Sequence, residues 1–274
     1  MQIGIMTGHF PRPTIEETLD AVISHGIRSV QFSLTSAGWE AMPESIELEE
    51  CGNVRQEMEA RGMTIAALNG EFNMVHPDVA KRKDGLQRLE VMASACKQLG
   101  TSVIGTCTGS KNPDSMWRSH PDNDSAEAWQ DLLVSMEQAV KCCETYGVTL
   151  AFEPEVNNVA NTAQKSRRLL DEIQSPNLKI IMDGANIFHK GQLPRMTEIL
   201  DEAFDLLGDD VAFAHAKDLD RDGDAGHLPA GHGLLDYERY WRLLGGLGFD
   251  VPVILHGLKE EQVDGCVAFL KGLP

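Results

Sequence analysis

The chain has 274 residues, 42% of them apolar, which is enough for one large domain with a full core. Its formal charge of −18 repels phosphate backbones and so argues against a nucleic-acid partner. No apolar run approaches the roughly 20 residues of a membrane span, the N-terminus shows no signal peptide, and the six cysteines lack the spacing of a disulfide framework. We therefore expect a cytoplasmic protein with reduced thiols and no membrane association.

Strands and helices are predicted to alternate along the whole chain. Eight short runs rich in Val, Ile and Leu indicate strands buried on both faces. They are Ile3–Met6, Ser29–Phe32, Thr64–Leu68, Ser102–Gly105, Val148–Phe152, Lys179–Met182, Val211–Ala214 and Pro252–Leu255. Amphipathic patterns between them predict helices at Ile15–Ser24, Ile46–Ala60, Ala80–Gln98, Ala126–Thr145, Ala163–Glu172, Met196–Leu206, Tyr237–Leu244 and Gln262–Leu270. Eight units of about 34 residues predict a single α/β domain over residues 1–274, a closed (β/α)8 TIM barrel.

The structural alternative is an open doubly wound sheet. Such a sheet usually carries a glycine-rich phosphate loop after its first strand, but that position here reads GHFPRPT rather than G-x-G-x-x-G, which favours the barrel. The longest strand-to-helix loops are Leu34–Ser45, Asn69–Asp78, Thr106–Ser125 and Leu219–Leu235. Barrels of this kind build their sites from the loops that follow the strands, so we expect functional residues at the strand C-termini.

Polar residues end four consecutive predicted strands. They are Glu153 in VTLAFEPEV, Asp183 in KIIMDGAN, His215 in VAFAHAKD and His256 in VPVILHGL. Neighbouring strands lie about 4.8 Å apart, so these side chains can converge on one ion. A single Asp or His at a strand end is more often structural, but four in series favour a metal site. Two carboxylates with one or two imidazoles suit a divalent cation such as Mn²⁺, Mg²⁺, Co²⁺, Fe²⁺ or Zn²⁺.

The chain resembles the xylose-isomerase-like TIM-barrel superfamily of sugar phosphate isomerases and epimerases. That superfamily includes ketose 3-epimerases, hydroxypyruvate isomerase, inosose-processing enzymes and the endonuclease IV group. Glu153 in FEPE, Asp183 in MDGAN and His215 in HAKD match the first three metal ligands of the family. The fourth ligand is usually a Glu on the last strand, where this chain has LHG, so the resemblance makes His256 the candidate replacement. Whether His256 or Leu255 points inward depends on the register of that strand.

The predicted chemistry is proton transfer next to a carbonyl. A divalent ion that chelates adjacent hydroxyl and carbonyl oxygens acidifies the C–H between them and stabilises the resulting enediolate. Glu153 is a candidate base, Glu155 and Glu71 are further candidates, and Lys217 completes the predicted catalytic set as a group that can bind a substrate oxygen. The sequence thus predicts a metal-dependent sugar isomerase or epimerase. A dehydratase or lyase acting on an inosose-like keto-polyol stays open as an alternative.

Several residues in the strand-to-helix loops suit recognition of a sugar or polyol. Trp39 and Trp117 can stack an aromatic face on the C–H face of a sugar, although capping the barrel mouth explains each of them equally well. His189 and Arg221 are the remaining candidates for substrate binding. We expect a small-molecule sugar or polyol-derived substrate, and the resemblance implies a homodimer or homotetramer.

Two rival functions follow from the same fold. An endonuclease IV relative would need additional His ligands, but Asn186 stands where that group has a His three places after Asp183, and the Asp-x-His expected after the seventh strand is missing. A non-catalytic sugar-binding barrel would keep the pocket and tolerate the loss of metal ligands. Glu153, Asp183 and His215 argue against this second reading, whereas His256 keeps it open.

Overall fold

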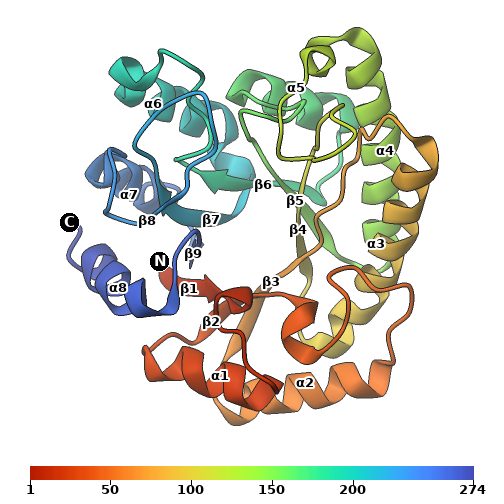
Figure 1. Cartoon of the computed structure of the whole chain (residues 1–274), viewed down its shortest axis with the longest axis vertical. Coiled ribbons are helices and arrows are strands. Elements are labelled where there is room, and N and C mark those ends of the chain that lie inside the picture. Colours follow the sequence, from red (N-terminus) through yellow and green to blue (C-terminus); the bar gives the residue numbers. More distant parts are fainter.

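Eight parallel strands close into a barrel in the computed structural model, which describes residues 1–274 (Figure 1). The strands are β1 (Gln2–Met6), β2 (Ser29–Phe32), β3 (Thr64–Asn69), β4 (Val103–Cys107), β5 (Thr149–Glu153), β6 (Leu178–Asp183), β7 (Val211–Asp218) and β9 (Pro252–Leu255). The helices are α1 (Ile15–Ser24), α2 (Leu48–Ala60), α3 (Val79–Leu99), α4 (Ala126–Thr145), α5 (Ala163–Ile173), α6 (Met196–Leu207), α7 (Tyr237–Gly245) and α8 (Val263–Lys271). The predicted (β/α)8 barrel is confirmed.

The strands pair in chain order from β1 to β6, and the ring closes through β7 and β9. The order is β6-β5-β4-β3-β2-β1-β9-β7, and β6 also pairs with β7. Asp183 of β6 lies in register with His215 of β7 across this closing pair. A ninth, two-residue strand, β8 (Leu228–Pro229), pairs antiparallel with the end of β7, outside the barrel.

Several strands run further at their C-terminal ends than their apolar runs indicate. The strand predicted to end at Ala214 continues to Asp218, and β5 and β6 end on Glu153 and Asp183 rather than one residue earlier. Backbone pairing with neighbouring strands continues past the last apolar side chain, since it does not depend on side-chain polarity. Glu153, Asp183, His215 and Lys217 therefore lie on strands rather than in loops.

Helix ends follow the capping chemistry of the sequence. Ser125 Oγ accepts from Ala128 N at the start of α4, and Thr162 Oγ1 accepts from Lys165 N at the start of α5. Gly100 ends α3 with a φ of 83°, a left-handed conformation that costs a glycine little. None of the helices combines the length and the apolarity that crossing a membrane requires.

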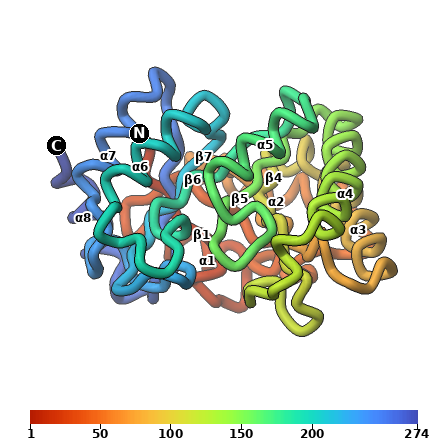
Figure 2. The backbone as a smooth tube through the Cα atoms, turned by 90° about the horizontal axis from the view of Figure 1, so that it is seen from above, coloured from red at the N-terminus to blue at the C-terminus, as the bar shows by residue number.

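Two apolar layers hold the barrel together. The larger one lies between the sheet and the surrounding helices. The smaller one consists of Ala67, Ala151, Ile181, Phe213 and Ile254. These residues come from β3, β5, β6, β7 and β9 and fill the barrel interior, as in other barrels of this type. The long loops that follow β4 and β7 lie on the same side of the molecule (Figure 2).

Candidate active site

Alternation along the strands brings the four predicted metal ligands to the barrel interior. Residues two apart on a strand share a face, and each predicted ligand follows a residue of the smaller apolar layer by two positions. The pairs are Ala151 and Glu153, Ile181 and Asp183, Phe213 and His215, and Ile254 and His256. Leu255 packs in the larger layer between sheet and helices. The register therefore turns His256, and not Leu255, toward the other ligands.

The four side chains form one buried group. One ligand atom from each of Asp183, His215 and His256 lies within 4.8 Å of the others. His215 Nδ1 lies 3.3 Å from Glu153 Oε1 and 3.8 Å from Asp183 Oδ2. His256 Nδ1 is buried without a hydrogen-bond partner, whereas Asp183 Oδ2 lies 3.1 Å from Lys217 Nζ. Buried polar atoms rarely lack partners, so this set of oxygen and nitrogen donors fits a divalent cation.

Lys217 compensates part of the negative charge of this group. Its Nζ lies 3.1 Å from Asp183 Oδ2 and 4.0 Å from Glu153 Oε1. Burial opposes the charge of Lys217, but the two carboxylates outweigh burial and raise its pKa. Lys217 is therefore a fixed ammonium group. Asn186 Nδ2 donates to Glu153 Oε1 at 2.7 Å and holds that carboxylate in place.

The ionisation states of the group suit cation binding. Burial opposes the charge of Glu153, but Lys217 and His215 outweigh it and lower the pKa of Glu153 below its ordinary value. Burial, reinforced by the charge of Glu153, raises the pKa of Asp183 to about 7. Burial and the charge of Lys217 lower the pKa of His256 well below its ordinary value. His256 is therefore neutral and keeps a lone pair for a ligand bond.

A cavity of about 320 Å³ adjoins the group. It is lined by Glu71, Trp117, Glu153, Glu155, Asn186, Lys217, Ala225 and His256. Asp183 and His215 lie next to this lining, because His215 contacts Glu153 and Asp183 contacts Lys217. Trp117 is 40% exposed and comes from the loop after β4, whereas Ala225 comes from the loop after β7. The two long loops thus share one cavity at the C-terminal ends of the strands.

Two further carboxylic acids line the cavity. Burial, followed by the charge of Glu153, raises the pKa of Glu71 to about 7. Burial also raises the pKa of Glu155 to about 8. Asn69 Nδ2 donates to Glu71 Oε2 at 3.2 Å, and Asn158 Nδ2 donates to Glu155 Oε2 at 2.7 Å. Acids that titrate near neutral pH can both take up and release protons under physiological conditions.

Comparison with known proteins agrees with this architecture. The model of the xylose isomerase-like TIM barrel family matches residues 19–271. The chain belongs to this family. Among curated relatives, the ketose 3-epimerase of Arthrobacter globiformis is 22% identical over 274 residues, which cover 96% of this chain and 86% of the relative.

Solved structures of the xylose isomerase-like fold cover nearly the whole chain. The apo form of 3-keto-D-glucoside 4-epimerase from E. coli aligns with a TM-score of 0.75 at 17% identity, over 99% of this chain and 99% of that one. The IolI protein with a bound zinc atom aligns with a TM-score of 0.74 at 15% identity, over 99% of this chain and 96% of that one. Identities this low establish the shared barrel.

Three residues predicted to bind substrate lie away from the cavity of this xylose isomerase-like barrel. Trp39 Nε1 donates to Glu50 Oε2 in α2 at 3.1 Å. His189 Nε2 lies 2.8 Å from the backbone oxygen of Asn161 and lines a separate pocket beside α5 and α6. Arg221 is exposed and pairs with two aspartates of its own loop. A position shortly after a strand therefore does not by itself bring a side chain to the cavity.

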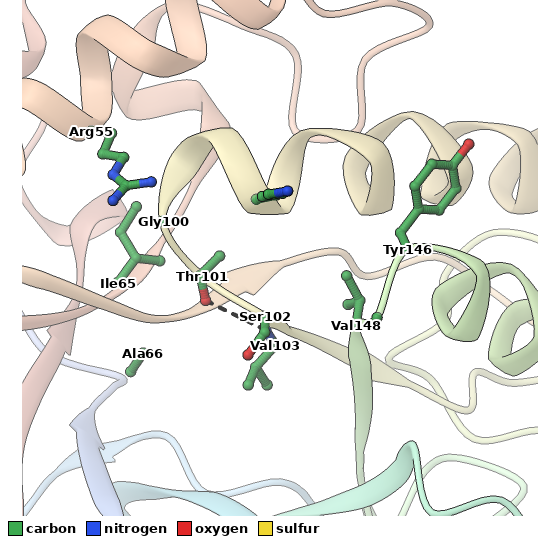
Figure 3. A pocket seen from close by; sticks show the side chains of 11 residues that line it. Arg55, Ile65, Ala66, Gly100, Thr101, Ser102, Val103, Tyr146 and Val148 are labelled. Carbon is green, nitrogen blue, oxygen red and sulfur yellow. Dashed lines mark hydrogen bonds between the residues drawn. The ribbon is translucent and has the colours of Figure 1, made fainter.

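A larger cavity, of about 590 Å³, lies at the opposite end of the barrel, where β4 and β5 begin. Figure 3 shows Arg55 and Tyr146 on opposite sides of it. No carboxylate or imidazole lines this cavity. A Cβ placed on Gly100, at the end of α3, would lie 3.4 Å from Arg55 Cδ. Arg55 pairs with Glu59 of its own helix at 2.7 Å, and Lys97 in the last turn of α3 complements the partial negative charge of that helix C-terminus.

Four polar residues of the site do not appear among the sequence candidates in a functional role. Gln31 and Asn69 contact His215 and Glu71, as described below. His9 Nε2 is buried without a partner, and the His9 ring lies 5.8 Å from that of His256. Asn186 holds Glu153 and accepts from the backbone of Gly226 at 2.9 Å. A detectable signal existed only for Gln31, which is an amide between Val30 and Phe32 in a strand that the sequence predicts to be buried.

Proposed function

We propose that this protein is a divalent-metal-dependent epimerase or isomerase of neutral keto sugars. The observation that carries the proposal is a shared cavity. The buried group of Glu153 and His256 and two separate carboxylic acids, Glu71 and Glu155, line it together. A site for proton transfer next to a carbonyl requires both parts, a centre that stabilises negative charge on oxygen and acids that move protons.

The residues that would hold the ion are Glu153, Asp183, His215 and His256. A bound ion would supply Lewis-acid stabilisation of the negative charge that develops on the sugar oxygens when the neighbouring C–H loses its proton. The unpartnered atom His256 Nδ1 supports this assignment. Lys217 supplies a fixed positive charge beside the carboxylates and can donate a hydrogen bond to a substrate oxygen.

Glu71 and Glu155 are proposed to move the proton. They follow different strands, β3 and β5, so they reach the cavity from different parts of its wall. Epimerisation removes a proton from one face of a carbon and returns one to the other face, which two separate acids can do. The raised pKa values of about 7 and about 8 match this task, because each acid can exchange its proton near neutral pH.

The charge of the cavity favours a neutral substrate. Three carboxyl groups line it, and Lys217 is its only basic lining residue. Lys217 already pairs with Asp183, and Arg221 pairs with aspartates of its own loop. A phosphate or carboxylate on the substrate would therefore find no free cationic side chain in this lining. A ketose without a charged group fits this lining.

Solvent hydrogen exchange tests the proposal. The Mn²⁺-loaded protein is incubated in D₂O with neutral ketoses and 3-keto sugars, and products are analysed by mass spectrometry and chromatography. We expect one deuterium per turnover in an epimer or isomer of the substrate. Loss of water would instead assign the dehydratase alternative, and no exchange with any substrate would favour a non-catalytic barrel.

Isosteric variants make the test specific. Glu71→Gln and Glu155→Gln keep the size of each side chain but remove its ability to carry a proton. We expect each to lower turnover by about 100-fold or more, in line with the usual contribution of a general acid or base. Glu198→Gln on the surface of α6, where Glu198 pairs with Arg195, is the matched control and should retain full turnover. Wild-type turnover in both cavity variants would remove them from the mechanism.

A further inference from the structure

A chain of three hydrogen bonds crosses the barrel interior from His215 to Glu71. Gln31 Oε1 lies 2.8 Å from His215 Nε2, and Gln31 Nε2 lies 3.3 Å from Asn69 Oδ1. Asn69 Nδ2 lies 3.2 Å from Glu71 Oε2. The chain links β7 to β2, β2 to β3, and β3 to the cavity acid that follows it. We call Gln31 and Asn69 the amide relay.

The Glu71 carboxylate, at one end of the chain, fixes the direction of each hydrogen bond in it. An ionised carboxylate only accepts hydrogen bonds, so Asn69 must turn its NH₂ group to Glu71 and its oxygen to Gln31. Gln31 must then turn its NH₂ group to Asn69 and its oxygen to His215. An amide oxygen also only accepts, so the proton between Gln31 and His215 belongs to His215 Nε2.

We propose that the amide relay positions His215 as the Nε2–H tautomer and thereby keeps Nδ1 free to bind a cation. A neutral imidazole carries one proton, so a proton fixed on Nε2 leaves the lone pair on Nδ1. Nδ1 is the nitrogen that faces Glu153 Oε1 at 3.3 Å and Asp183 Oδ2 at 3.8 Å. A cation bound among these three acceptor atoms would hold them together, and in the metal-free protein the Lys217 ammonium, 3.1 Å from Asp183 Oδ2, offsets part of their repulsion. The role in cation binding rests on the proposed function, whereas the tautomer does not.

The surroundings of Gln31 support a role in the site rather than in folding. The residue is 1% exposed in a barrel interior that is otherwise apolar at this level, and burying an amide costs free energy unless it is hydrogen-bonded. Both of its side-chain partners belong to the site. Gly105 of β4 leaves space for it, because a Cβ there would lie 3.3 Å from Gln31 Nε2. An apolar side chain at this position could be buried without any hydrogen-bond partner. We therefore attribute the presence of the Gln31 amide to its hydrogen bonds with the site.

The tautomer can be read directly from nitrogen-15 NMR of the metal-free protein, since a protonated ring nitrogen and one with a lone pair have well-separated shifts. The signals of His215 are assigned from a His215→Asn variant. Spectra are recorded at pH 8.5, where Glu71, with a pKa of about 7, is ionised. We expect the Nε2–H form in the wild type. The Nδ1–H form or the doubly protonated ring would overturn the proposal.

Variants of the relay separate positioning from folding. Gln31→Met keeps a side chain of similar length but removes the oxygen that accepts from His215 Nε2. We expect this variant to lose the preference for the Nε2–H tautomer. It should also bind Mn²⁺ about 10–100-fold more weakly, the usual cost when a metal-binding His loses the hydrogen-bond partner of its other ring nitrogen. Gln31→Glu keeps an acceptor for His215 and should retain both the tautomer and the affinity. Asn69→Ala leaves Gln31 in place without its orienting partner, so it should give a mixture of tautomers. It also serves as a second test should Gln31→Met not fold.

Asn177→Ala is the matched control, because Asn177 Nδ2 donates to Val148 O at the far end of the barrel, at 2.9 Å. It loses a comparable amide bond and should change neither tautomer nor affinity. Retention of Nε2–H and of wild-type Mn²⁺ affinity in both Gln31→Met and Asn69→Ala would refute the proposal. An Nε2–H wild type that shows no solvent exchange with any sugar would count against the proposed function alone.

Discussion

Lys217→Met should strongly destabilise the metal-free protein. Met keeps the length of the side chain but removes the ammonium group. In the wild type, the Lys217 and Asp183 side chains are 6% and 0% exposed, and Nζ lies 3.1 Å from Oδ2. Removing one partner of a buried ion pair leaves an uncompensated charge, which typically costs about 3–5 kcal/mol. For a chain near this size, that loss corresponds to a Tm lower by roughly 6–20 °C.

The sign of the pH dependence follows from linkage. Without Lys217, a proton can take the place of the ammonium on Asp183, whose pKa burial already raises to about 7. The variant then takes up a proton on Asp183 when it folds to a greater extent than the wild type does, so its stability falls more steeply as the pH rises. We expect the difference between wild type and variant to be larger at pH 8 than at pH 6. Mn²⁺ should recover more stability in the variant, because no ammonium competes for the carboxylates.

Urea unfolding of the EDTA-treated proteins, followed by circular dichroism at both pH values, measures these differences. Lys179→Met is the matched control: Lys179 pairs with Asp210 at 2.6 Å, but its side chain is 30% exposed and Arg167 also contacts that carboxylate. Partly exposed pairs contribute about 1 kcal/mol or less, so this variant should lose little. Equal stability of Lys217→Met and the wild type at pH 8 would show that Lys217 does not compensate the buried carboxylates.

Two further outcomes can be checked on the same protein. Tyr240→Phe removes a hydroxyl that lies 2.8 Å from Met182 O and 3.0 Å from His215 O and donates its single proton between them. It should therefore lower the free energy of unfolding by about 1–3 kcal/mol in urea titrations; an unchanged midpoint would contradict this. Trp117→Ala removes the partly exposed aromatic side chain that lines the cavity and should raise KM for a turned-over sugar by roughly tenfold, as the loss of about 1.4 kcal/mol of stacking predicts, with little change in kcat. A lower kcat at constant KM would instead place Trp117 in the chemical step.

Local patterns were sufficient to predict most of the fold. The limits of α1, α4, β2 and β9 agree with prediction to the residue, because apolar periodicity and capping residues act within a few positions. The extension of β7 and the presence of β8 could not be predicted in this way. They depend on the pairing of Lys217 with Pro229 and on Asp218, whose carboxylate accepts from the backbone of Gly233 and Leu235.

The site residues that end consecutive strands could be predicted from the sequence. Those that depend on contacts across the barrel interior could not. Glu153, Asp183, His215 and His256 stand two positions after interior residues, which a strand pattern reveals. Gln31 meets His215 across a sequence separation of 184 residues, and no spacing rule connects them. Trp39, His189 and Arg221 lie in loops whose paths depend on many weak contacts, so neither residue type nor sequence position fixes their direction.

The imidazole of His256 at the position of a family carboxylate bears on which metal the protein would acquire in a cell. Oxygen ligands suit hard ions such as Mg²⁺, whereas each added nitrogen shifts preference toward zinc, iron and nickel. A donor set in which an uncharged imidazole replaces a carboxylate also attracts any dication less strongly through charge alone. The growth medium, and competition among trace elements within the host, would then decide the ion in a purified sample, and stripping followed by defined reloading becomes the necessary first step of any assay.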